Sequence, residues 1–181
     1  PVGRERTEGI GYFNIMKIGI DARMYGSSQT GIGNYIRYLT SELFKIDMEN
    51  EYVLFLREPE FSTYEIHSGY VRKIKAPAKW YSWAEQTQFC KILYREKLDL
   101  VHFPHFNSPL LYRGASVVTI HDVIPFYYPG HKVGASAFRR VAYGVVFRNS
   151  VRHARKVLAV SEHTKKDIVE HAGIDQAKIC V

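Results

Sequence analysis

The sequence predicts an α/β fold in which a parallel β-sheet carries helices on both faces. From Met16 onward, short apolar runs rich in Val and Ile alternate with longer segments of helical period, the pattern of parallel strands joined by crossover helices. Several of these runs are apolar on successive residues, as in strands that are covered on both faces. The expected strands are residues 17–21, 52–56, 71–75, 98–103, 116–120 and 157–160.

The first expected helix has the clearest helical period. It begins at Gly31 and Gly33, and its apolar residues recur at steps of three and four. The members of this apolar stripe are Ile32, Tyr35, Ile36, Leu39, Leu43 and Ile46. Further helices are expected over residues 80–97, 136–156 and 161–171, and Gly173 is the expected stop of the last one.

The length and composition fit one ordinary globular domain. The 181 residues are 46% hydrophobic and 24% charged, and no apolar run reaches the roughly 18 residues needed to span a bilayer. Cys90 and Cys180 stand too far apart for a disulfide framework or a zinc ribbon, which favours a reducing, cytoplasmic location. Residues 1–15 lack the apolar core of a signal peptide, and we interpret them as an extension, from upstream or cloning sequence, before a domain over residues 16–181.

A glycine-rich turn joins the first expected strand to the first expected helix. Gly31 and Gly33 allow main-chain amides to approach a ligand closely, and a helix N-terminus offers free N–H groups to a phosphate or a sugar oxygen. Asn34 and Tyr35 follow in the first helical turn, so these four residues are candidate substrate contacts. The alternative is a strand-to-helix turn that binds no ligand.

A dinucleotide-binding fingerprint is a second alternative for this turn. It requires a third glycine where Ile36 stands, and a much tighter turn than residues 22–30 provide. The second strand ends in Arg57 and Glu58 rather than in a clear ribose-binding acid, although Arg57 would suit NADP. A stand-alone Rossmann-like binding module, NADP-linked or regulatory, therefore stays open as the alternative function.

Polar residues follow two further strands at the point where each one ends. His121 and Asp122 come after the strand over residues 116–120, and Asn107 follows the strand over residues 98–103. The carboxyl ends of parallel strands form the crevice in which open α/β sheets bind ligands. His121 is therefore the candidate catalytic residue, and Asp122 and Asn107 are candidate substrate contacts. The alternative is a histidine held by a main-chain carbonyl, with Asp122 capping a turn.

Ser161 follows the last expected strand and begins the last expected helix. A serine at this position is well suited to cap the N-terminus of that helix. The helix start also faces the expected crevice, so Ser161 is both an expected N-cap and a candidate substrate contact.

The sequence gives little support for a metal site. His102 and His105 have a spacing seen in metal ligands, but Pro104 prevents the helix that would bring both rings to one side. No Asp-x-Asp pair is available to hold Mg²⁺ against a diphosphate. We therefore expect no metal ligands in this chain.

Taken in order, these segments resemble glycosyltransferase family 4, and within it the bacterial mannosyltransferases of surface polysaccharide assembly. The matching segments are residues 17–23 (KIGIDAR), 30–35 (TGIGNY), 99–102 (DLVH), 119–125 (TIHDVIP) and 157–168 (VLAVSEHTKKDI). They span the chain from Met16 to its end, and their order and spacing carry the resemblance.

The resemblance implies a GT-B fold, in which two Rossmann-like domains face each other across a cleft. It implies that this chain is the N-terminal, acceptor-side half, that the donor-binding half is absent, and that the chain alone is inactive. The implied reaction is a retaining transfer of a sugar, such as mannose from GDP-mannose, to a glycan or lipid-linked acceptor without a required metal. By the same resemblance, Gly31 and Gly33 lie against the donor phosphate or sugar, and His121 contacts the donor sugar near its anomeric carbon. Glu162 and Glu170 have the spacing of the family's Glu-x7-Glu motif, but they stand in the wrong half and are given no such role.

The net charge of +7 is concentrated between Lys132 and Lys166, where nine Lys or Arg residues stand against the single acid Glu162. The expected apolar side of the helix over residues 136–156 consists of Phe138, Val141, Ala142, Val145 and Val146. The arginines expected on another face are Arg140, Arg148, Arg152 and Arg155. Such a face would suit peripheral docking on an anionic membrane leaflet, and a merely solvated helix surface is the alternative. Nucleic acid is not expected as a partner, because the basic side lacks interleaved aromatic residues for stacking.

Overall fold

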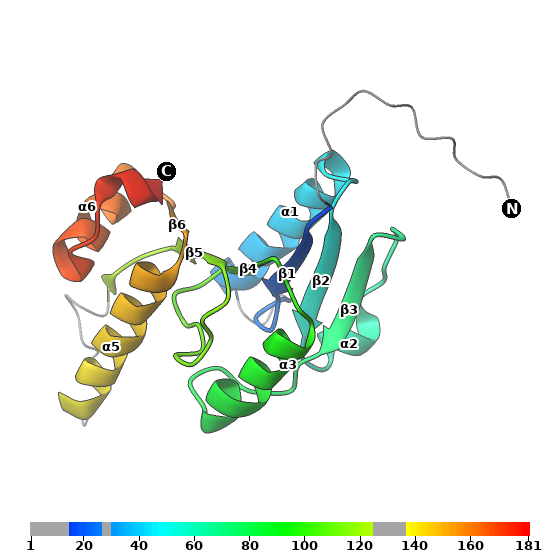
Figure 1. Cartoon of the computed structure of the whole chain (residues 1–181), viewed down its shortest axis with the longest axis horizontal. Coiled ribbons are helices and arrows are strands. Elements are labelled where there is room, and N and C mark those ends of the chain that lie inside the picture. The colour runs from blue at the N-terminus through cyan, green and yellow to red at the C-terminus, as the bar shows by residue number, and fades with distance from the viewer. Residues whose placement is uncertain (1–14, 27–29, 125–136) are drawn as a thin grey trace, which may run out of the picture.

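A sheet of seven parallel strands forms the centre of the protein, in the order β3-β2-β1-β4-β5-β6-β7 (Figure 1). The computed structural model describes residues 15–26, 30–124 and 137–181, apart from the side chains of residues 30 and 137–140. The strands are β1 (Lys17–Asp21), β2 (Glu51–Leu56), β3 (Val71–Lys75), β4 (Leu100–Phe103), β5 (Ser116–Ile120), β6 (Lys156–Ala159) and β7 (Ile179–Cys180). The helical elements are α1 (Thr30–Ile46), α2 (Glu60–Thr63), η2 (Glu85–Phe89), α3 (Cys90–Arg95), α5 (Ala137–His153), α6 (Glu162–Ala172) and η3 (Gln176–Lys178).

The predicted α/β class and all six predicted strands are confirmed, with strand ends that differ by at most two residues. The first and last predicted helices are confirmed as α1 and α6, and Gly173 ends α6 in the left-handed region, with φ of 61°. Three of the described elements were not predicted. With four residues in α2, three in η3 and two in β7, all three are too short to show a hydrophobic period.

The helix expected over residues 80–97 is shorter than predicted. Residues 83 and 84 are helical and lead into η2, a π-helical segment, and α3, so the helical stretch covers residues 83–95. A turn precedes them, in which Tyr81 has a positive φ of 58°. The main-chain N–H of Tyr81 donates to a Glu85 carboxylate oxygen at 2.9 Å, so the turn is fixed by the first residue of η2.

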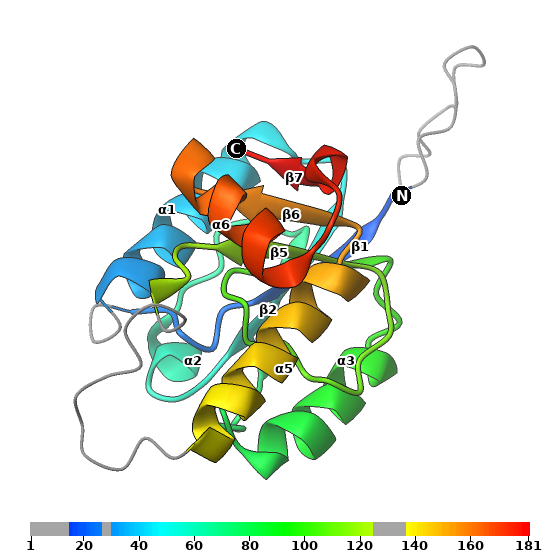
Figure 2. The ribbon, with the colours of Figure 1, turned by 90° about the vertical axis from the view of Figure 1, so that its left-hand side faces the viewer.

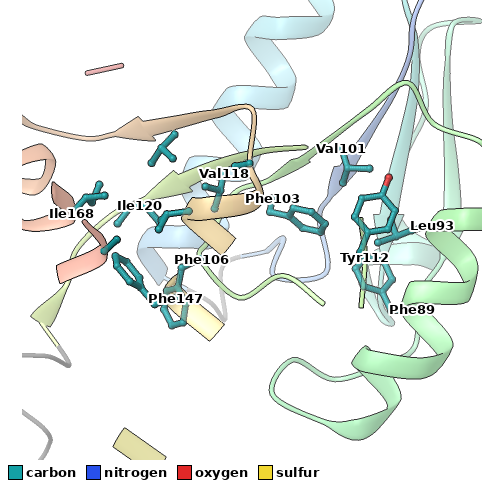
Figure 3. Close-up of a cluster of buried hydrophobic side chains, with 14 of the residues drawn as sticks. Phe89, Leu93, Val101, Phe103, Phe106, Tyr112, Val118, Ile120, Phe147 and Ile168 are labelled. Carbon is teal, nitrogen blue, oxygen red and sulfur yellow. The ribbon is translucent and has the colours of Figure 1, made fainter. Parts of the chain in front are cut away.

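Helices cover both faces of the sheet (Figure 2). On one face, Tyr52 and Leu54 of β2 pack with Ile36 of α1 and Phe61 of α2. Phe55 points to the opposite face and joins a larger core with α3, α5 and α6. The aromatic side chains in this larger core include Phe89, Phe103, Phe106, Tyr112 and Phe147 (Figure 3). Each fully buried phenylalanine contributes about 1.5–3 kcal/mol, so this face supplies much of the stability.

The buried side of α5 differs from the expected one. Val141 and Val145 are 65% and 50% exposed, so the prediction that they belong to the apolar side is wrong. Phe147, Val151 and Ala154 enter the core instead, because the helix meets the sheet and α6 through its C-terminal half. None of the helices in the described part of the chain is long and apolar enough to cross a bilayer.

Two arginines on the outer side of α5 cap the end of α6. Arg148 Nε donates to the main-chain oxygen of His171 at 3.1 Å, and Arg152 donates to that of Ala172 through Nε at 3.3 Å and Nη2 at 3.1 Å. Carbonyls in the last turn of a helix lack partners within it, and cationic side chains there also complement the helix dipole. Arg148 and Arg152 therefore stabilise the packing of α6 on α5, while the side chain of Arg140 lies outside the described residues.

Candidate functional site

The segments that follow β1, β4 and β5 meet at the carboxyl edge of the sheet. β1 pairs with β2 on one side and β4 on the other; the chain continues from β1 into α1 on one face, whereas the loop after β4 packs into the core of the opposite face. Where the connections from two neighbouring parallel strands leave on opposite faces of a sheet, a crevice opens between them in which such sheets bind ligands. The residues that line the small crevice found there are Asp21, Arg23, Met24, Ile32, Ile36, Trp80, Pro104, His105 and Asn107.

The two glycines at the start of α1 have different surroundings. Gly33 is buried, and a Cβ atom placed there would lie 2.1 Å from the main-chain oxygen of Gly26 and 3.0 Å from that of Met24. Gly31 is exposed, and a Cβ atom there would have no heavy atom of the described residues within 4 Å. Gly33 therefore permits close packing of the preceding turn, whereas Gly31 and Asn34 are exposed, and their role as substrate contacts stays a prediction.

A line of polar groups lies between α1 and the sheet. The hydroxyl of Tyr35 is 3.0 Å from Thr119 Oγ1, which is 2.8 Å from His102 Nε2. Burial lowers the pKa of His102 from 6.5 to about 4, so this ring is neutral near pH 7. Tyr35, a predicted substrate contact, is thus joined to the sheet by its hydroxyl group.

His121, the predicted catalytic residue, stands at the end of β5 with a fixed partner. Its Nε2 lies 2.9 Å from the main-chain oxygen of Pro104, and because a carbonyl only accepts, Nε2 carries the hydrogen. Its ring meets that of Tyr35 edge to face, with centroids 4.8 Å apart. The neighbouring Asp122 is exposed and accepts the Ile124 N–H at 3.1 Å, which is the turn-capping contact given as the alternative above.

Arg23 is the centre of a buried ionic network beside the crevice, with an exposed fraction of 4%. Its Nε and Nη2 donate to the two oxygens of Asp21 at 2.8 and 2.7 Å, and Nη2 also donates to Glu85 Oε1 at 2.6 Å. Nη1 donates to the main-chain oxygen of Ala78 at 3.2 Å, and the guanidinium lies 3.8 Å from the ring centroid of Phe89. Burial opposes the charge, but the two carboxylates prevail and raise the pKa of Arg23 above its ordinary value.

Glu85 connects this network to the loop after β4. Both of its oxygens accept hydrogen bonds from Asn107 Nδ2, at 2.7 and 2.8 Å. Burial raises the pKa of Glu85, while the charge of Arg23 and the hydrogen bonds of Arg23 and Asn107 lower it, and the net direction is upward. Every neighbour donates to Glu85, and we conclude from this geometry that it is an ionised carboxylate at neutral pH. Asn107, a predicted substrate contact, therefore lines the crevice while its amide is held by Glu85.

Ser161 caps α6 as predicted. Its Oγ accepts the Thr164 N–H at 3.1 Å, and its main chain is extended, as an N-cap residue requires. Ser161 is absent from the residues that line the described crevice, so its role as a substrate contact stays a prediction.

Sequence reasoning did not find the network of Asp21, Arg23 and Glu85. One signal was present in the sequence: the acid Asp21 ends the apolar strand β1, and the base Arg23 follows two residues later. Charges that are buried at such a place need partners. Glu85 carried no comparable signal, since it is 62 residues from Arg23 and lies in a segment of helical period.

No group of three His, Cys, Asp or Glu side chains that could hold a metal ion occurs among residues 15–26, 30–124 and 137–181. The rings of His102 and His105 also have different partners. His102 contacts Thr119, whereas His105 Nδ1 accepts the Asn107 N–H at 3.3 Å.

Comparison with known proteins identifies the family. The model of glycosyltransferase family 4 matches residues 29–181. The chain belongs to glycosyltransferase family 4. The parallel sheet and its helices accordingly form a Rossmann-like domain of the GT-B type, as the resemblance implied.

Two relatives show how far the similarity extends. The O-antigen chain mannosyltransferase RfbU of Salmonella typhimurium is 30% identical over 105 residues, which cover 58% of this chain and 28% of that protein. The solved structure of the wall teichoic acid polymerase TagF superimposes with a TM-score of 0.58 at 9% identity, over 92% of this chain and 38% of the other. The similarity to TagF shows the fold alone, and this family 4 chain spans less than half the length of either relative.

Replacing Gly33 with Ala is expected to destabilise the protein by about 1–3 kcal/mol, because the added Cβ meets main-chain atoms that cannot move aside easily. Gly31→Ala, two residues earlier in the same helix, is the matched control, because its Cβ would meet none of the described residues. It is expected to be neutral or stabilising by about 0.5–1 kcal/mol. Urea unfolding measures both free energies. Equal effects of the two substitutions would show that Gly33 has no special packing role.

Lowering the pH from about 7 to about 4.5 is expected to destabilise the protein through His102. His102 has a pKa of 6.5 in the unfolded chain but a pKa of about 4 in the folded protein, so between these pH values only the unfolded chain binds the proton. Stability that is present above pH 6.5 is therefore lost as the pH falls through this range. At about 1.4 kcal/mol for each unit, the loss is on the order of 1–3 kcal/mol. His102→Gln, which can still bond to Thr119, should show a smaller loss in urea unfolding at the two pH values, and an unchanged loss would contradict the assignment.

Proposed function

We propose that this chain is the N-terminal, acceptor-side domain of a retaining glycosyltransferase, which moves a sugar from a nucleotide-sugar donor to a glycan or lipid-linked acceptor. Family membership supports this proposal, as does a crevice at the edge where parallel sheets bind substrates. The observation that carries it is the fixed ring of His121 at that edge, between Pro104 and Tyr35. A second domain would bind the donor nucleotide.

In the proposed reaction, the bond from the anomeric carbon to the diphosphate breaks and the bond to the acceptor oxygen forms on the same face of the sugar. The departing phosphate takes the proton of the acceptor hydroxyl, and fixed dipoles stabilise the oxocarbenium-like state. His121 donates through Nε2 to Pro104, so its Nδ1 can accept a hydrogen bond from a sugar hydroxyl. The N-terminus of α1 at the exposed Gly31 offers N–H groups to the phosphate, and these contacts require no metal.

We further propose mannose, supplied as GDP-mannose, as the donor sugar. The support is the name of the relative RfbU, an O-antigen chain mannosyltransferase. A protein that joins this domain to its donor-binding half is incubated in parallel with GDP-mannose, GDP-fucose and UDP-glucose. Transfer from GDP-mannose is expected, and transfer from GDP-fucose or UDP-glucose alone would contradict this choice.

A stand-alone NADP-binding module is the alternative, and the structure offers it one feature. Arg57 is placed over the ring of Trp80, 5.1 Å from its centroid, near the carboxyl edge where a 2′-phosphate would lie. Against it, Ile36 is buried in the core where the fingerprint would have its third glycine. Titration with NADPH, followed by its fluorescence, is expected to show no binding.

Replacing His121 with Ala is expected to reduce turnover about 30- to 1,000-fold with a smaller effect on nucleotide binding, because a lost transition-state contact costs on the order of 2–4 kcal/mol. The measurement is transfer of labelled sugar by a protein that joins this domain to its donor-binding half, since we expect the chain alone to be inactive. His153→Ala, an exposed histidine at the end of α5, is the matched control and should retain normal turnover. Near-normal turnover of the His121 variant at saturating substrate would make this histidine structural.

The outer side of α5 is proposed to dock on the anionic inner leaflet of a membrane, where a lipid-linked acceptor resides. The exposed Val141 and Val145 lie on the same helix as the exposed Arg148 and Arg152, and the exposed Arg155 follows two residues after the end of α5. Together they give an apolar and basic surface. Because Arg148 and Arg152 also cap α6, they are unsuitable for a test that must leave the fold unchanged.

Sedimentation with vesicles of phosphatidylcholine and phosphatidylglycerol tests this surface. Binding is expected to rise with the phosphatidylglycerol fraction and to fall with salt, because salt screens the attraction. The double substitution Arg140→Gln and Arg155→Gln should weaken binding roughly 30-fold, since each basic side chain near the surface contributes about 1 kcal/mol. Arg95→Gln, an exposed arginine in α3, is the control. Equal binding to neutral and anionic vesicles would identify this side of α5 as merely solvated.

A further inference from the structure

The loop over residues 104–110 is irregular and yet mostly buried. The loop follows β4, and the chain becomes exposed directly after it, at Leu111. Some polar groups of the loop bond within it, as the Asn107 N–H does to His105 Nδ1. Others find partners outside the loop, because no regular ladder satisfies them. Two consecutive side chains of η2, Glu85 and Gln86, provide such partners at two points of the loop.

Glu85 binds the middle of the loop. It is completely buried, with 0% exposure, and accepts the amide of Asn107 on both carboxylate oxygens. Hydrogen bonds to a charged group are stronger than neutral ones. Arg23 balances the charge of Glu85 at 2.6 Å, so Glu85 cannot turn away without leaving a buried cation with one partner fewer.

Gln86 binds the end of the loop, where its Oε1 accepts the Leu110 N–H at 2.6 Å. On the other side of the loop, Phe106 faces Phe147 of α5 in the core, with ring centroids 6.1 Å apart (Figure 3). The loop is therefore held between η2 and α5, by polar contacts on one side and aromatic packing on the other.

We infer that Glu85 and Gln86 are positioning residues for His121. The loop that they hold begins at Pro104, whose main-chain oxygen accepts the His121 Nε2–H at 2.9 Å. Asn107 is only three residues further on, so a loop held at Asn107 leaves the Pro104 carbonyl little room to move. Fixing the loop at Asn107 therefore fixes the acceptor that orients the His121 ring.

The chemical consequence is the choice of tautomer. A neutral imidazole carries one hydrogen, and the hydrogen bond made by one nitrogen decides the state of the other. With Nε2–H directed at Pro104, Nδ1 of His121 is an acceptor for a hydroxyl group. The value of this tautomer for sugar transfer rests on the proposed function, whereas the control of His121 by Glu85 and Gln86 does not.

Nitrogen-15 NMR of the imidazole rings tests the inference on the chain itself, without donor or acceptor. In the unmodified protein, His121 is expected to show the Nε2–H tautomer. The double variant Gln86→Ala and Asn107→Ala removes both contacts to the loop and leaves Glu85 with Arg23. In this variant the His121 nitrogen shifts should move to values intermediate between the two tautomers, and the Leu110 amide should exchange with solvent at least about tenfold faster.

Gln88→Ala is the matched control, because Gln88 is an exposed glutamine of the same π-helical segment. It should leave the His121 spectrum and the Leu110 exchange rate unchanged. A hydrogen on Nδ1 in the unmodified protein, or an unmodified spectrum in the double variant, would overturn the inference.

Exchange in the unmodified protein provides a second measurement that does not depend on the double variant folding. If the loop positions His121, the Leu110 amide and the His121 ring N–H become exposed in the same opening event, with equal opening free energies as urea is added. Clearly different opening free energies would overturn the inference. Neither experiment measures sugar transfer, so failure here is distinguishable from failure of the proposed function.

Discussion

A guanidinium group that is almost fully buried determines how the carboxyl edge of this sheet is built. Removing such a charge from water costs several kcal/mol, and the cost is recovered only through well-placed partners. Arg23 finds them in Asp21 at the end of β1, in Glu85 of η2, and in the carbonyl of Ala78 after β3. Because these partners come from different parts of the chain, the ionic network ties β1 to the connection between β3 and β4.

The π-helical form of η2 is consistent with this constraint. In a regular α-helix, consecutive side chains point about 100° apart and do not serve the same neighbour. Glu85 and Gln86 nevertheless both reach the loop after β4, at Asn107 and Leu110. A wider π-helical turn brings them closer in direction, and such turns are frequent at functional sites. The positive φ of Tyr81 belongs to the same arrangement, since its N–H is bound by Glu85.

The sequence was informative wherever structure follows from local periodicity and uninformative where distant contacts decide. The strands could be predicted because they are short apolar runs covered on both faces, and α1 because its apolar residues recur at the spacing of one buried helix face. The buried side of α5 could not, since Val141 and Phe147 are equally apolar and only the position of the sheet decides which is covered. His121 could be placed at the carboxyl edge of the sheet because it directly follows a strand, although it is absent from the residues that line the crevice. Glu85 is recognised only when Arg23, distant in sequence, lies beside it.

His121 stands where polar groups from both faces of the sheet meet. From the face of α1, the ring of Tyr35 meets it edge to face, and the Tyr35 hydroxyl is connected through Thr119 to the neutral His102. From the opposite face, the loop held by η2 presents the carbonyl of Pro104. The first contact limits the tilt of the ring and the second selects its tautomer, so neither alone defines the direction of Nδ1. A side chain at a strand end is thereby given a single orientation although it is only partly buried.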